Sequence, residues 1–177
     1  MALRTTFIAS ILITASLVTG SAYAALESRL GGQAVYDTDL NITWLANANL
    51  AATNTFGVVG IRDGVFAPGQ MQWNTAQSWI AAMNGANYLG LNDWRQPGTL
   101  QPDASCDANT GASYGYNCTG SEMGHLFYSE GLNNPNSSNY GLFSNVQVTY
   151  SSGTTYALDP NFAWSFGMGG WLPDHRP

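Results

Sequence analysis

The sequence predicts an α+β fold that combines one or two short helices with small antiparallel sheets and long ordered loops. Three observations predict it. Residues 74–83 carry apolar side chains at the 3–4 residue spacing of an amphipathic helix. Short runs of alternating apolar and polar residues, bounded by turn residues, occur near both ends of the chain. Charged residues make up only 9% of the chain while aromatic residues reach 12%, so large rings are expected to fill the core.

The first half of the chain is expected to hold a β-hairpin followed by the main helix. In order, the expected elements are strands over residues 34–38 and 41–45, an irregular helical turn within 46–55, a surface loop over 57–69 and the helix over 74–83. Asp39 and Asn41 supply the turn of the hairpin. Asn74 or Thr75 can cap the helix through a side-chain oxygen, and Asn84-Gly85 is expected to end it.

The second half of the chain is expected to contain a looped segment, a short helix and a final antiparallel meander. The expected elements are a strand or turn over residues 92–95, a loop over 99–117, a helix over 121–130 and short strands within 146–150, 155–156 and 162–166. Ser121 is the expected cap of the short helix. Turns at Ser152-Gly153 and at residues 159–161 are expected to separate the final strands.

The N-terminus predicts export. Arg4 precedes an apolar run over residues 7–18, and a small-x-small cleavage site ends at Ala24. This pattern predicts a secretory signal peptide over residues 1–24. The alternative is an uncleaved membrane anchor, although the run is shorter than the roughly 20 residues that span a bilayer. Residues 25–177 are then expected to form one domain that no transmembrane segment interrupts.

Charge narrows the class of partner. The chain has five basic residues, all of them arginine, against eleven acidic residues, and a net charge of −6. Such a surface repels phosphate backbones and anionic head groups, so nucleic acid and acidic membranes are excluded as expected partners. Sulfated polysaccharides are excluded for the same reason, because they need clustered basic side chains.

The two cysteines, Cys106 and Cys118, lie in one loop. In the oxidising compartment that a signal peptide implies, such an isolated pair is expected to form a disulfide. Metal ligation and a reactive thiol pair are the alternatives. Ligation would need further histidine or cysteine at suitable spacing, and redox chemistry is typical of a C-x-x-C arrangement, which is not present.

An ordered set of short motifs runs through the chain after residue 25. The set comprises Val35-Tyr36-Asp37, Thr43-Trp44-Leu45, Met71-Gln72-Trp73, Asn92-Asp93-Trp94-Arg95-Gln96-Pro97, Tyr150-Ser151-Ser152-Gly153 and Ala163-Trp164-Ser165-Phe166. It resembles the Lcl C-terminal domain family of bacterial exported proteins, although Gln96 stands where that family usually has leucine. The resemblance implies a fold similar to C-type lectin-like domains and a secreted, periplasmic or cell-surface location in a bacterium.

The loop between the cysteines and the segment Ser121-Glu122-Met123-Gly124-His125-Leu126 resemble a subgroup whose members end in a PEP-CTERM sorting signal. This chain ends at Asp174-His175-Arg176-Pro177 without such a signal. The expectation is therefore either that the C-terminus is truncated or altered, or that the protein is released instead of sorted.

The candidate ligand-binding residues are Trp94, Arg95, Glu122, His125 and Trp171. Arg95 is either a guanidinium at a ligand groove or one half of a buried ion pair with Asp93 or Glu122 that orders loops. Glu122 and His125, three residues apart, are either an acid–base pair or half a metal site, or else a helix cap and a packed imidazole. Trp171 is the indole most suited to stack on a sugar.

Metal binding is left open by the sequence. Gln101-Pro102-Asp103 matches the galactose-type calcium motif of C-type lectins, but the Trp-Asn-Asp that should follow it is not found downstream. Calcium held by Asp and Asn oxygens of other loops is the alternative. No further cofactor is expected.

The sequence shows no phosphate loop and no H-E-x-x-H motif. The expected function is therefore that of an exported, non-enzymatic domain that acts in surface or extracellular-matrix interaction and binds neutral glycans. Two alternatives stay open. One is an enzyme that uses Arg95, Glu122 and His125 in a cleft, and the other is a purely structural protein associated with exopolysaccharide.

Overall fold

The computed structural model describes residues 26–107 and 114–169. Within these residues the fold is mixed α/β, with two small antiparallel sheets and few helices, as the sequence predicts. The signal peptide expected over residues 1–24, the C-terminal residues 170–177 and the candidate residue Trp171 lie outside the described residues. None of the helices described has the length and apolar character needed to cross a bilayer.

The first sheet has three strands in the order β1-β2-β3, namely β1 Leu26–Arg29, β2 Ala34–Asp37 and β3 Ile42–Leu45. The sequence predicts β2 and β3 but not β1, whose Leu26-Glu27-Ser28-Arg29 has no clear alternation. The β2–β3 turn is closed by Asp37, whose Oδ1 accepts the backbone N–H groups of Asp39 and Leu40 at 3.1 and 3.0 Å. Asn41 takes a positive φ of 54°, a conformation that asparagine tolerates well.

The second sheet is a single hairpin, β4 Thr149–Tyr156 and β5 Asp159–Gly167. The predicted turns at Ser152-Gly153 and at residues 159–161 are wrong. The chain continues through Ser152 with an irregularity in strand register, and the hairpin turns at residues 157–158. The physical reason is a neighbouring loop: Pro97 O accepts Ser152 Oγ–H at 3.0 Å and Gly153 N–H at 2.9 Å, which replaces turn hydrogen bonds.

The main helix α1 spans Trp73–Gly85, slightly longer than predicted. Its buried residues Trp79 and Met83 are spaced by four, which confirms the apolar face. Neither Asn74 nor Thr75 caps it, because both lie inside the helix, and Gln72 at the cap position makes no side-chain cap bond. The described residues also form four 3₁₀ turns: Leu30–Gly32, Leu50–Ala52, Tyr88–Gly90 and Tyr140–Leu142.

The second predicted helix is present but changes type. A short α-helix, α2 Glu122–Gly124, runs directly into a π-helical turn, His125–Ser129. The π geometry is set by the Glu130 N–H, which donates to His125 O at 3.1 Å, five residues back. Ser121 does not cap α2 with its side chain, since its Oγ instead donates to Asp103 Oδ2 at 2.8 Å.

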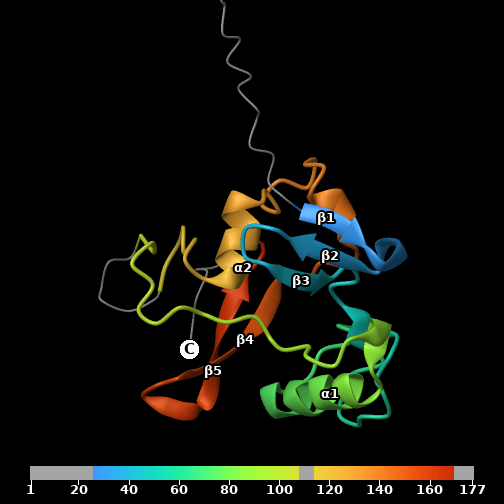
Figure 1. Ribbon diagram of the computed structural model, residues 1–177. Helices are drawn as coiled ribbons and strands as arrows, with labels where there is room; N and C mark the ends of the chain where they lie inside the picture. The colour runs from blue at the N-terminus through green and yellow to red at the C-terminus, as the bar shows by residue number, and fades with distance from the viewer. Residues whose placement is uncertain (1–25, 108–113, 170–177) are drawn as a thin grey trace, which may run out of the picture.

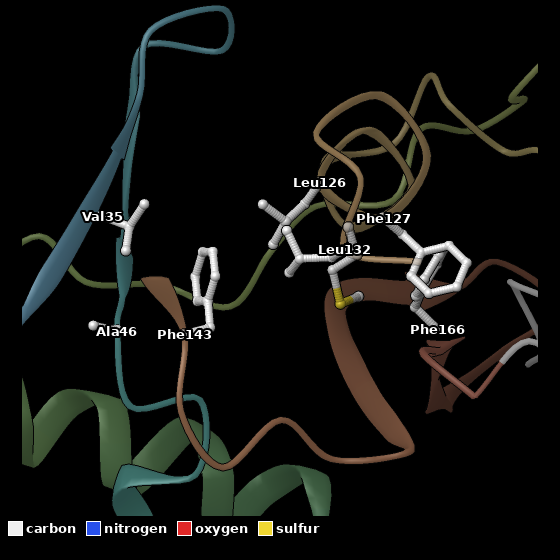
Figure 2. Packing of buried hydrophobic residues seen from close by; sticks show 8 residues of the cluster. Val35, Ala46, Leu126, Phe127, Leu132, Phe143 and Phe166 are labelled. Carbon is white, nitrogen blue, oxygen red and sulfur yellow. The ribbon is translucent and has the colours of Figure 1, made fainter. Parts of the chain in front are cut away.

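Two clusters of buried apolar residues form the core. The first joins both sheets to α2 and the π-helical turn, and its buried members are Val35, Ala46, Met123, Leu126, Phe127, Leu132, Phe143 and Phe166 (Figure 2). The second packs under α1 and consists of Leu50, Ala51, Trp79 and Met83. Figure 1 shows α1 below the first sheet, with the β4–β5 hairpin beside both. The rings of Phe127 and Phe166 pack edge to face with their centroids 5.6 Å apart, so aromatic rings fill part of this core.

The predicted disulfide between Cys106 and Cys118 is present. Both half-cystines are buried, and Cys118 is fully so. Asp103, also buried, lies just before Cys106 and is bonded to Ser121, so this segment is fastened to the start of α2. The two half-cystines and Asp103 are therefore part of the folded body.

Candidate functional site

A groove of about 900 Å³ lies where β3, α1 and β4 approach one another. The loop over residues 93–97 crosses it, and Glu122 at the start of α2 reaches it. Its polar lining is dominated by amide and hydroxyl groups, and the charged and aromatic side chains in it include Asp93, Arg95, Glu122, Trp44 and Trp94. Arg95 lies at its solvent side, with 56% of its side chain exposed.

Arg95 and Glu122 form a two-pronged ion pair in this groove. Arg95 Nη1 donates to Glu122 Oε2 at 2.7 Å and Arg95 Nη2 to Glu122 Oε1 at 2.5 Å, the geometry in which a guanidinium matches a carboxylate. The Gly98 N–H donates to the same Oε2 at 2.6 Å. Of the two partners that the sequence offers for Arg95, the structure thus places Glu122 on the guanidinium, although Arg95 is more exposed than a buried pair would be.

The electrostatics of the pair favour its charged form. Partial burial opposes ionisation of Glu122, but the hydrogen bonds from Arg95 and Gly98 outweigh it and hold the pKa of Glu122 below its ordinary value. The hydrogen bond with Glu122 raises the pKa of Arg95 against the opposing effect of burial. Two opposite charges held together in this way leave the groove with little net charge from this pair.

The ion pair also fixes the loop that follows Arg95. Arg95 Nη1 donates to Gln96 O at 3.1 Å, and the Glu122 N–H donates to Gly98 O at 3.3 Å. On the other side of the loop, Pro97 O is held by Ser152 and Gly153 of β4. Residues 95–98 are therefore fastened to α2 on one side and to the second sheet on the other.

Trp94 is held in place by its polar groups. Its indole Nε1–H donates to Tyr88 O at 3.1 Å, and its backbone N–H and C=O bond to the side-chain amide of Asn84, each at 2.9 Å. The half-buried ring packs against the second core cluster and also lines the groove. Its indole N–H is therefore already used, and the ring can offer a ligand only apolar contact.

His125 does not join Arg95 and Glu122. Its Nε2 lies 3.2 Å from Glu130 Oε1, and it is not among the residues that line the groove. Burial and the nearby negative charge of Asp37 raise the pKa of Glu130, although His125 acts against this. Glu122 and His125 thus have different partners, despite lying three residues apart.

Sequence reasoning missed Asp37 and Glu130 as partners of His125. Glu130 lies five residues after His125, a spacing that faces it in a π-helical turn but not in an α-helix. Asp37 belongs to the first sheet, far away in the chain. The sequence does show an acidic residue, Glu130, at the end of the predicted helix. Its pairing with His125 can be predicted only if that turn is known to be π-helical.

Of the Gln101-Pro102-Asp103 motif, the aspartate carboxylate is buried and hydrogen-bonded inside the protein, while Gln101 and Pro102 are exposed. Asp103 is 4% exposed, and its Oδ1 accepts both the N–H and the Oγ–H of Ser105 at 3.0 and 2.5 Å. Its Oδ2 accepts Ser121 Oγ–H. The carboxylate thereby links the disulfide segment to α2.

Comparison of the chain with protein-family models, with curated proteins and with solved structures gives no match.

Proposed function

We propose that this chain is an exported, non-enzymatic recognition domain whose groove binds neutral glycans, in surface or extracellular-matrix interaction of a bacterium. The observation that carries the proposal is the chemistry of the groove. Its arginine is neutralised by its glutamate, and much of the remaining polar lining is amide and hydroxyl, beside indole rings. Sugars without charge are recognised by such groups, through hydrogen bonds to hydroxyls and apolar contact with rings.

The resemblance of the motifs to the Lcl C-terminal domain family and the predicted signal peptide support the location and the fold type. Under this proposal the domain is C-type lectin-like and works outside the cytoplasm. The net charge of −6 supports neutral over sulfated glycans, because clustered positive charge is needed to hold sulfate groups.

An enzyme built on Arg95, Glu122 and His125 is less well supported. Glu122 accepts three donors and has a lowered pKa, which makes it a poor proton donor near neutral pH. His125, the natural proton carrier, pairs with Glu130 instead. A binding role uses the pair as it stands, as fixed scaffolding of the groove.

The test is a glycan array of neutral and sulfated oligosaccharides probed with the exported, purified chain. We expect hits among the neutral glycans and none among the sulfated ones. The double variant Gln70→Ala/Thr149→Ala alters two exposed groove residues and should weaken binding of a hit about tenfold, the effect of losing about 1.4 kcal/mol of contact.

The matched control is Asn136→Ala, which removes an exposed amide away from the groove and should leave the affinity unchanged. No hit above background on the array would overturn glycan binding. If Asn136→Ala weakened binding as much as Gln70→Ala/Thr149→Ala does, the groove would not be the glycan-binding site.

A further inference from the structure

Away from the groove, three side chains with metal-binding atoms converge from two distant parts of the chain. They are Asp37 at the end of β2, His125 at the start of the π-helical turn and Glu130 directly after that turn. One ligand atom from each residue lies within 4.8 Å of the others. Ligands about 2.1 Å from one tetrahedral ion lie about 3.4 Å apart, so a small closing movement would bring these atoms to coordination distance.

The cluster is sequestered from solvent. Asp37 is fully buried, Glu130 is 2% exposed, and the side chain of His125 is 17% exposed. Two carboxylates inside a protein repel each other and lose hydration, which is costly unless a positive charge accompanies them. His125 meets only one oxygen of Glu130, and Asp39 adds a third negative charge nearby.

One oxygen of the cluster is left without a partner. Glu130 Oε2 is buried and has no hydrogen-bond donor among the residues that the structure describes. Asp37, by contrast, uses Oδ1 to close the β2–β3 turn, and its Oδ2 receives only a long contact of 3.4 Å from Trp44 Nε1. A buried, unsatisfied carboxylate oxygen beside a second carboxylate and an imidazole is an arrangement that a cation would satisfy.

We propose that Asp37, His125 and Glu130 form a binding site for a divalent transition-metal ion, represented here by Zn²⁺. The imidazole decides the class of ion. Calcium and magnesium take oxygen ligands, whereas zinc and its neighbours in the first transition row accept nitrogen and carboxylate oxygen together. Three protein ligands leave one tetrahedral position to water or a further ligand.

The consequence is a cross-link within the fold. Asp37 closes the hairpin of the first sheet, while His125 and Glu130 bracket the π-helical turn whose residues Leu126 and Phe127 enter the first core cluster. An ion held by all three would tie the sheet to this turn. An ion that binds the folded state but not the unfolded state stabilises the fold by mass action.

The proposal is tested by titrating the metal-free chain with Zn²⁺ in a His175→Ala background. This substitution removes the only other histidine of the chain, so that any imidazole ligand must be His125. We expect one Zn²⁺ per chain by calorimetry and by elemental analysis. At a free concentration about 100-fold above the dissociation constant, the melting temperature should rise by about 5–10 °C and fall back on addition of a chelator.

Glu130→Gln is the decisive variant, because it keeps the size of the side chain and removes one ligand charge. It should lower Zn²⁺ affinity at least tenfold, while the control Glu27→Gln, an exposed acid outside both the cluster and the groove, should leave it unchanged. Ca²⁺ should produce no comparable rise in melting temperature.

Two further results keep the proposal falsifiable if Glu130→Gln does not fold. The absorption spectrum of Co²⁺ bound to the unaltered cluster should show tetrahedral ligation, and the ring resonances of His125 should shift on Zn²⁺ addition. Less than one ion per chain, an unshifted His125 ring, undiminished binding by a folded Glu130→Gln variant, or equal stabilisation by Ca²⁺ would each overturn the assignment.

Discussion

Glu122 fastens the loop over residues 95–98 to α2, because its carboxylate accepts hydrogen bonds from both Arg95 and Gly98 of that loop. We expect Glu122→Gln to lower the free energy of unfolding at pH 7 by about 1 kcal/mol, discounted for the 56% exposure of Arg95. Since the pKa of Glu122 is lowered in the folded state, this contribution is present above about pH 4.3 and is lost as the pH falls further. Wild type and variant should therefore converge in acid, as urea unfolding at several pH values would measure.

The matched control for this prediction is Glu27→Gln. Glu27 pairs with Arg29 at 3.0 Å, but both side chains are about half exposed, at 57% and 49%. Exposed pairs of this kind contribute little, so we expect a change within about 0.5 kcal/mol. A similar loss from both variants would show that the hydrogen bonds of Glu122 add nothing beyond an ordinary surface pair.

At the scale of single elements, the short helix α2 depends on the absence of a side chain at Gly124. A β-carbon placed there would lie 1.8 Å from Cys118 O and 2.8 Å from Cys118 C, both of them backbone atoms. Gly124→Ala must therefore displace either α2 or the disulfide segment, and we expect a loss of more than about 3 kcal/mol in thermal or urea unfolding.

Gly85→Ala provides the control, because Gly85 ends α1 and a β-carbon there meets no atom within 4 Å. Alanine favours helix over glycine, so the control should be neutral or more stable by up to about 1 kcal/mol. An unchanged Gly124→Ala variant would contradict the close approach of α2 to Cys118.

The same elements show what the sequence could predict. The helix α1 is predictable because the apolar residues Ala76, Trp79, Ile80 and Met83 recur at the 3–4 residue spacing of a helix. The π-helical turn was not, because no side-chain period distinguishes a single widened turn that the Glu130 N–H closes. Ser152 was assigned to a turn since serine and glycine favour turns, whereas its hydroxyl is bonded to Pro97 O across 55 residues.

Long-range contacts limit the prediction of the candidate site in the same way. The sequence narrows the ion-pair partner of Arg95 to Asp93 or Glu122, because Asp93 lies in the same motif as Arg95 and Glu122 lies at a predicted helix start. The convergence of Asp37 with His125 and Glu130 depends on how the first sheet packs on α2, and no local pattern encodes that packing.

For the whole molecule, the question is whether two core clusters make one unfolding unit. The clusters are separate sets of buried residues, yet hydrogen bonds join the parts that hold them. Trp73 Nε1 of α1 donates to Ser152 O of β4 at 2.9 Å, and Ala48 N–H donates to Ser144 O at 2.9 Å. The loop over residues 95–98 adds the links to α2 and β4 described above. We therefore expect a single cooperative transition for the disulfide-intact protein.

Truncation of one buried side chain in each cluster tests this expectation. Met83→Ala should cost about 2–5 kcal/mol and Phe166→Ala about 3–5 kcal/mol, since both side chains are at most 2% exposed. In one cooperative unit, each variant lowers the urea midpoint with an unchanged slope of free energy against urea, and tryptophan fluorescence and far-ultraviolet circular dichroism give the same midpoint. The alternative result is that Met83→Ala lowers the slope and that β signal remains in the circular dichroism after α1 has unfolded. The α1 cluster would then unfold separately, because a smaller slope means that less surface is exposed in the main transition.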